Sequence, residues 1–261
     1  MLGLRIFVYV IVAMMLLPVL ITFPVALTSV ARISFPPVGI SGRWFAAILN
    51  DPVLLAAITR SFWLALTAAI VGTLIALPCA FVIERGRLPG RNLLETWITG
   101  PRMIPQIVLA LALLAYFERI GLAESFAGLL IAHLVITIPF AFRTLLVSVS
   151  TLDRRLEWSS EVLGASPTYT LLHIIVPQLK TGLIAAFIFT FILSFNNVTL
   201  ALFLSGFGQR TLPVEMFQRM NVGGMTPAIP AISFVLAVVG VTLFIFLDRT
   251  VGVYRFLAGR D

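Results

Sequence analysis

Charged residues are scarce in this chain: Asp, Glu, Lys and Arg make up only 11% of its 261 residues, whereas hydrophobic residues make up 60%. Soluble domains contain about 25% charged and about 45–50% apolar residues. The shortage of charge therefore excludes an ordinary water-soluble enzyme. It is typical of a chain whose surroundings are largely lipid.

Residues that serve redox, metal or phosphate chemistry are also few. The one cysteine, Cys79, excludes an internal disulfide and a multi-cysteine metal site. His133 and His173 are forty residues apart, and neither forms a metal-ligand spacing with an acidic residue. The only lysine, Lys180, lacks the preceding glycine of a phosphate-binding loop. We therefore expect no metal, no cofactor and no enzymatic activity in this chain.

Long apolar runs are what the chain does have, and they lack the strict alternation of barrel strands. They predict an all-α integral membrane protein with one transmembrane domain, 1–261, of six transmembrane helices. A secretory signal is the alternative for the first run, but its length favours an uncleaved span. The expected spans are approximately 6–30, 58–83, 97–117, 125–147, 183–204 and 229–247.

The distribution of basic residues predicts the orientation. Eleven Lys and Arg residues, including Arg87, Arg255 and Arg260, fall on the side of the N-terminus, and six fall on the other. Because positive charge marks the cytoplasmic side, both termini are expected to be cytoplasmic. The net charge of +7 then reflects topology and contact with anionic lipid, and no nucleic-acid partner is expected.

Residues 148–181, between the fourth and fifth spans, form the one long cytoplasmic connection. They predict a helix over about 152–163 that ends at Gly164 in the left-handed conformation. Ser166 is the expected N-cap of a second helix with Pro167 at its first position, and that helix stops at Pro177. Such a helix-turn-helix is either an ordered cover for the helix ends or a docking surface for a soluble partner.

This segment resembles the EAA loop of ABC importer permeases, which places the coupling loop at 148–181. Gly164 and the three residues after it match the family pattern in spacing, as does Pro177, whereas the Glu-Ala-Ala triplet is degenerate, with Trp158 at its Glu position. The candidate ATPase-coupling residues are Glu157, Trp158, Ser159, Ser160, Glu161, Leu163, Gly164, Ala165, Ser166, Pro167 and Pro177.

Residues 193–199, 201–206 and 211–213 are similar to the second permease of spermidine/putrescine-type importers. The resemblance implies a type I ABC importer permease fold in a bacterial inner membrane. It also implies two ABC ATPase subunits that bind ATP and Mg, a second permease that is a different chain, and a periplasmic substrate-binding protein. This chain would form half of the translocation path.

Polar residues within the spans are the candidates for lining that path. Arg102 and Gln106 lie four apart in a stretch broken by two prolines, and Asn196 and Asn197 interrupt the fifth span. The alternatives are that Arg102 reaches the membrane interface and that the asparagines join helices. The same two roles, joining helices or lining the path, are open to His133.

The candidate path carries no carboxylate, which a cationic polyamine would require as a partner. We therefore expect a small polar solute that is zwitterionic or anionic, even though the resemblance is to polyamine importers. The alternative function is a secondary transporter or channel without ATPase partners. It would need ionisable residues at the membrane midplane, for which Arg102 and His133 are the candidates.

Overall fold

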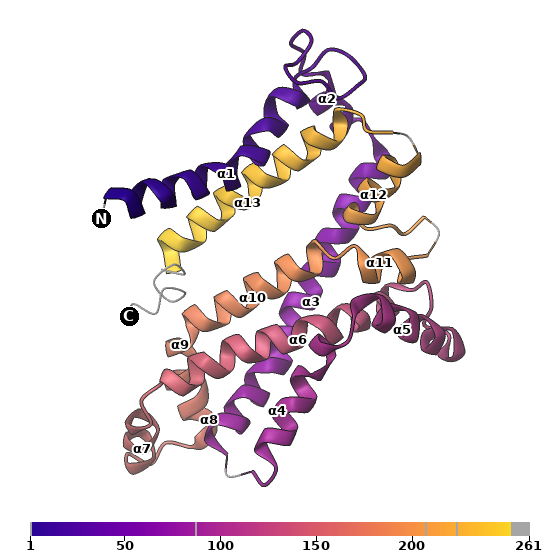
Figure 1. Ribbon diagram of the computed structural model, residues 1–261. Helices are drawn as coiled ribbons and strands as arrows, with labels where there is room; N and C mark the ends of the chain where they lie inside the picture. The colour runs from indigo at the N-terminus through magenta and orange to yellow at the C-terminus, as the bar shows by residue number, and fades with distance from the viewer. Residues whose placement is uncertain (1, 87, 207, 223, 252–261) are drawn as a thin grey trace. The chain divides into compact units, whose positions relative to one another are not determined.

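The computed structural model describes residues 2–86, 88–206, 208–222 and 224–251, and within these ranges the chain is helical without strands (Figure 1). The all-α prediction is confirmed. The helices in chain order are α1 (Leu2–Ala26), α2 (Arg43–Leu49), α3 (Pro52–Arg85), α4 (Arg91–Thr99), η1 (Gly100–Met103), α5 (Gln106–Ile120), α6 (Phe126–Thr151), α7 (Arg155–Val162), α8 (Pro167–Thr170), η2 (Leu171–Ile175), α9 (Val176–Gln178), α10 (Lys180–Phe195), α11 (Thr199–Leu204), α12 (Leu212–Val222) and α13 (Ala228–Val251).

Three helices are long and apolar enough to cross a bilayer by themselves: α1, α3 and α6. Two further crossings are possible if bent pairs count as one span each, α4–η1 with α5 at 98° and α8–α9 with α10 at 71°. The apolar part of α13, Ala228–Leu243, is shorter. The chain is thus a multi-pass membrane protein, and the number of six spans stays a prediction.

The expected third span, 97–117, is sharply bent rather than straight. Ile104 has φ −85° and ψ 130°, which is extended backbone, and Pro105 follows it before α5 begins. A proline disfavours helical backbone at the preceding residue, which explains the break. The expected fifth span, 183–204, is likewise interrupted after Phe195 and resumes at Thr199. The break at the prolines was predicted from the sequence, whereas 183–204 was expected as one continuous span with two polar residues in it.

The chain divides into two compact units: Met1–Ile58 with Val214–Leu247 (unit 1), and Thr59–Pro213 with Asp248–Asp261 (unit 2). In unit 1, α1 runs beside α13, where the rings of Phe23 and Phe234 have centroids 4.6 Å apart (Figure 1). Almost all of α1 is apolar and exposed, as a helix that faces lipid requires. Arg87, Arg255, Arg260 and the expected cytoplasmic C-terminus lie outside the described residues.

Asp51 fixes the start of α3 within unit 1. Its Oδ1 accepts hydrogen bonds from the backbone N–H groups of Val53 (3.1 Å) and Leu54 (3.0 Å), so Asp51 acts as the N-cap. Its Oδ2 lies 2.6 Å from Arg219 Nη1, and Arg219 Nε lies 2.8 Å from Glu215 Oε1. The hydrogen bond from Arg219 lowers the pKa of Asp51, against the opposing effect of its partial burial.

Asp51→Asn should remove this ion pair while keeping the cap, because Asn caps helices about as well as Asp. The pair is partly exposed, so we expect a loss of about 1 kcal/mol or less at pH 7. Because the folded-state pKa is lowered, the contribution is complete above the unfolded-state value, about 3.9, and is lost as pH falls through the folded-state pKa. Thermal unfolding in detergent from pH 7 down to pH 3 measures both effects. Unchanged unfolding temperatures for Asp51→Asn and Arg219→Gln at pH 7 would contradict the assignment.

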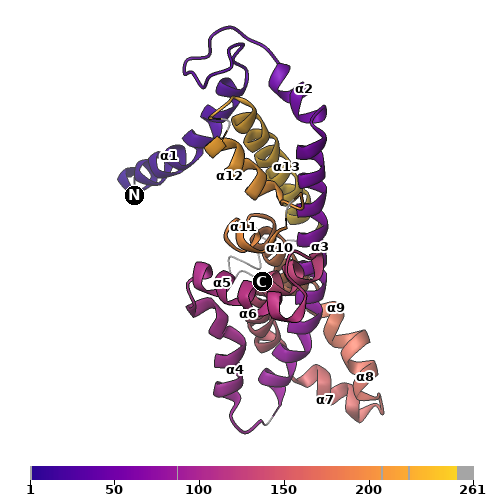
Figure 2. The ribbon, with the colours of Figure 1, turned by 90° about the vertical axis from the view of Figure 1, so that its right-hand side faces the viewer.

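In unit 2, α6 and α10 lie side by side and run in opposite directions (Figures 1 and 2). The buried pair His133 Nδ1 and Ser194 Oγ, 2.7 Å apart, sets their register. One turn further along both helices this register pairs Thr137 with Thr190, and a methyl group built on Gly72 of α3 would lie 3.4 Å from Thr190 Cγ2 and 3.8 Å from Thr137 Oγ1. Small side chains therefore let three helices approach closely.

Ala186→Leu should test this close packing, because Ala186 is fully buried on the side of α10 that faces α6. Three added carbon atoms have no space there, and overpacking of this kind costs about 1–3 kcal/mol. We expect a lower unfolding temperature and less folded protein in detergent, measured by size-exclusion fluorescence. The control is Ala112→Leu on the exposed face of α5, which should leave both quantities unchanged. Wild-type stability of Ala186→Leu would contradict the packing.

Candidate functional site

The connection between α6 and α10 has the helix-turn-helix geometry that the sequence predicts. Gly164 has φ +80°, its N–H donates to the Glu161 carbonyl (2.9 Å), and the Ala165 N–H donates to the Ser160 carbonyl (3.1 Å). These two bonds form a Schellman motif, which uses the last free carbonyls of a helix. The left-handed prediction for Gly164 is confirmed, although α7 begins at Arg155, a few residues after the expected position near 152.

The second arm also begins as expected. Ser166 Oγ accepts the Tyr169 N–H at 3.3 Å, and Pro167 occupies the first helical position. The prediction that this helix stops at Pro177 is wrong by one residue, because α9 continues to Gln178. The wide π-type turn of η2 precedes Pro177, and such a turn accommodates a residue that has no N–H to donate.

The two arms are held together at their base. Ser160 Oγ of the first arm and Thr170 Oγ1 of the second are 2.7 Å apart and buried. Within the second arm, the Tyr169 and His173 rings stack at 4.2 Å. Beside this contact the arms border an open hollow of about 610 Å³. It is lined by Leu156, Ser159, Ser160, Leu163, Gly164, Ala165, Ser166, Tyr169 and Ile174. The arrangement is a folded surface with a concave face.

Apolar side chains on this surface point into solvent. Val162 is 87% exposed and Leu163 is 86% exposed, and Trp158 is also largely exposed. Tyr169 and Leu172 are also exposed. The sequence motif identified neither of these residues, nor Val162. The signal that could have identified them is their apolar character on short helices among polar neighbours.

The other predicted loop residues differ in burial. Ser159, Glu161, Gly164, Ser166, Pro167 and Pro177 are exposed, Ala165 is half-buried and Ser160 is buried. Glu157 is half-buried and faces the end of α3, where its Oε1 lies 3.0 Å from Arg85 Nε. The segment therefore has an outward surface and one acidic residue that faces inward.

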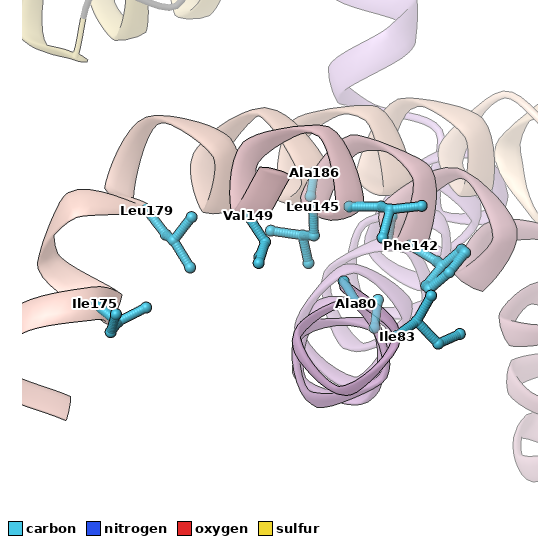
Figure 3. Packing of buried hydrophobic residues seen from close by; sticks show 11 residues of the cluster. Ala80, Ile83, Phe142, Leu145, Val149, Ile175, Leu179 and Ala186 are labelled. Carbon is cyan, nitrogen blue, oxygen red and sulfur yellow. The ribbon is translucent and has the colours of Figure 1, made fainter. Parts of the chain in front are cut away.

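The loop is seated on an apolar cluster at the same end of α3. Figure 3 shows Ala80 and Ile83 of α3 beside Phe142 of α6, with Ile175 and Leu179 of the loop in the same cluster. These residues are almost completely buried. Their burial fixes the second arm against α3 and α6.

Two of the four candidate path residues are in contact. Asn197 Nδ2 donates to Gln106 Oε1 at 3.3 Å, and Asn197 Oδ1 accepts the Leu200 N–H at 2.9 Å, at the start of α11. Arg102 is exposed in η1, on the other side of the break, with its guanidinium 4.4 Å from the centre of the Phe140 ring. Asn196 is exposed at the end of α10. The structure thus joins Gln106 and Asn197 by a hydrogen bond, places Arg102 against Phe140 and leaves Asn196 exposed.

Of the two roles considered for His133, joining helices or lining the path, its contacts favour joining helices. It is fully buried, and its bond to Ser194 connects α6 with α10.

Comparisons with known proteins identify the family. The model of the family described as "Binding-protein-dependent transport system inner membrane component" matches residues 69–254. The spermidine/putrescine transport system permease protein PotC of Haemophilus influenzae is 28% identical over 207 residues, which cover 79% of this chain and 80% of the relative. The putrescine transport system permease protein PotI of Escherichia coli is 29% identical over 215 residues, covering 79% and 76%.

Solved structures show the same fold. A bacterial ABC transporter involved in the import of the acidic polysaccharide alginate aligns with a TM-score of 0.72 and 14% identity, covering 95% of both chains. The MetNI methionine ABC transporter aligns with a TM-score of 0.64 and 19% identity, covering 76% of this chain and 94% of the other. Permeases of this family work with ATPases and a substrate-binding protein. The chain belongs to the family of binding-protein-dependent inner-membrane transport components, and it is a permease subunit of an ABC importer.

Proposed function

We propose that residues 148–181 are the ATPase-coupling loop of this permease and that the chain forms half of the translocation path. One observation carries the proposal: Val162 and Leu163 are almost fully exposed on a turn that is held rigid by a Schellman motif. Exposed apolar residues outside the long helices favour contact with another protein.

The partners that fit this surface are two ABC ATPase subunits, one of which receives this loop. ATP and Mg would be bound by the ATPases, and ATP-driven closure of that pair would pull on the loop. A second permease, a different chain, would complete the path, and a periplasmic substrate-binding protein would deliver the solute. With both termini cytoplasmic, the loop lies on the ATPase side of the membrane.

The solute that best fits the candidate path residues is small, polar and zwitterionic or anionic. Gln106 and Asn197 offer amide groups, and Arg102 offers a cation beside Phe140. Neither the amide pair nor the Arg102–Phe140 contact supplies the carboxylate that a polyamine cation would favour. The relatives PotC and PotI belong to spermidine and putrescine transport systems. A competition assay separates polyamines from zwitterionic and anionic solutes.

Purification of the tagged chain from native membranes in mild detergent tests the coupling proposal. We expect mass spectrometry to recover an ABC ATPase and a second permease with it. Recovery of the chain alone, together with solute flux in proteoliposomes that contain no ATPase, would support the secondary transporter or channel instead.

Uptake competition tests the solute class. In cells that carry the complete importer, zwitterionic and anionic solutes should compete with the transported substrate, and Arg102→Gln should weaken import of an anionic one. High-affinity spermidine uptake that no anionic solute inhibits would contradict this part of the proposal.

A further inference from the structure

Arg85, the last residue of α3, contacts the coupling loop at two points. Its Nη2 donates to the Leu152 carbonyl at 2.8 Å, where the chain leaves α6. Its Nε lies 3.0 Å from Glu157 Oε1, in the first turn of α7, in an orientation that makes this contact an ion pair rather than a hydrogen bond. One guanidinium thus holds both the exit of α6 and the start of α7.

The loop holds the end of α3 in return. Arg154 Nη2 donates to the Glu84 carbonyl at 3.0 Å, and a carbonyl at a helix end has no partner within its own helix. The Glu84 side chain pairs with Arg91 of α4 at 2.8 Å. A chain of contacts therefore runs from α7 through the end of α3 to α4.

Burial distinguishes the Arg85–Glu157 pair from the other ion pairs of unit 2. The difference lies in the arginine: the Arg85 side chain is 9% exposed, whereas Arg91 and Arg143 are 42% and 49% exposed. The carboxylate partners Glu157, Glu84 and Glu95 are alike, at 19%, 19% and 21%. A buried pair resists separation, because breaking it would leave a charge without its partner away from water. It can therefore transmit force between two elements that an exposed pair would not hold together.

We propose that Arg85 and Glu157 are positioning residues that transfer movement of the coupling loop to α3. This inference rests on the proposed coupling function and adds that α3 is driven directly by α7. The covalent connections of the loop reach only α6 and α10. The carboxylate of Glu157 turns inward for this task, while the ATPase contacts the outward face around Val162 and Leu163.

A double-mutant cycle with Arg85→Gln, Glu157→Gln and the double variant tests the inference in the complete importer. The readout is the ratio of solute imported to ATP hydrolysed, with ATPase recovery measured alongside. We expect each single variant to lower the ratio about tenfold, as coupling between contacting residues allows, and the double variant to fall no further than the worse single. ATPase recovery should stay at the wild-type level, because the docking face is unchanged.

The control cycle uses Arg143→Gln and Glu95→Gln, an exposed ion pair between α6 and α4 outside the loop. We expect these variants to change the ratio less than about twofold. Arg85→Lys keeps the charge but not both contacts, so it should give an intermediate ratio. If Arg85→Gln does not fold, Arg85→Lys replaces it in the cycle with Glu157→Gln.

The outcomes separate the two proposals. If the wild-type chain recovers no ATPase, the coupling function fails and the inference fails with it. If ATPase is recovered but the ratio is unchanged, or the two single effects multiply in the double variant, only the transfer through Arg85 and Glu157 is overturned. Equal losses of ATPase recovery and import would show that the pair serves docking alone, which also overturns it.

Discussion

Leu163→Asp should abolish import while leaving the folded permease in the membrane. The Leu163 side chain is 86% exposed in the isolated chain, so a charged replacement meets water and leaves the fold unchanged. In the proposed complex the same position is covered by the ATPase. The variant would then lose about 1.5–3 kcal/mol of apolar burial and would bury a carboxylate without a partner, at a further cost of several kcal/mol. A total above about 4 kcal/mol corresponds to binding weakened by about a thousandfold.

ATPase recovery and solute uptake measure this effect. The matched control is Val222→Asp at the end of α12, where the side chain is 88% exposed and lies outside the coupling loop. The control should recover the ATPase at the wild-type level, whereas Leu163→Asp should not. If the two variants recovered ATPase equally, the exposed face of the loop would not be the docking surface.

The sequence predicts the local geometry of the loop well because that geometry depends on neighbouring residues. The C-terminal end of α7 follows from Gly164, and the start of α8 follows from Ser166 and Pro167. Each is fixed by hydrogen bonds within about five residues. The break at Pro105 is predicted for the same reason. The backbone preferences of proline and glycine, and the side-chain bonding of serine and asparagine, act at short range.

Contacts between distant segments are what the sequence does not reveal. Arg85 and Glu157 are 72 positions apart, and nothing in either neighbourhood indicates the other. The motif alone would assign Glu157 to the ATPase, whereas its inward direction depends on where α3 ends. Gln106 and Asn197 were selected as polar residues in apolar surroundings, but their mutual contact needs the packing of α5 against α11.

Gly164→Val should also weaken coupling strongly, by a different route. Gly164 has φ +80°, and a Cβ built there meets no atom within 4 Å, so added volume by itself causes no clash. The cost comes from the backbone: the left-handed conformation costs an L residue about 1–2 kcal/mol, and β-branched residues adopt it rarely. Relief of this strain would break the bonds from Gly164 to Glu161 and from Ala165 to Ser160. The outward side chains of α7 would then lose their fixed position beside the hollow.

We expect solute uptake by Gly164→Val to fall about tenfold or more. A tenfold loss follows when the displaced docking surface weakens binding of the ATPase by about 1.4 kcal/mol. Membrane insertion and yield should stay at wild-type levels. Gly164→Asn should retain most uptake, because Asn tolerates the left-handed conformation. The matched control is Gly121→Val, since Gly121 ends α5 with φ +71° and open space, outside the loop. Loss of uptake in both valine variants would indicate general misfolding, and wild-type uptake by Gly164→Val would mean that coupling does not need this turn. Only a loss confined to Gly164→Val and relieved in Gly164→Asn ties coupling to the backbone conformation at this residue.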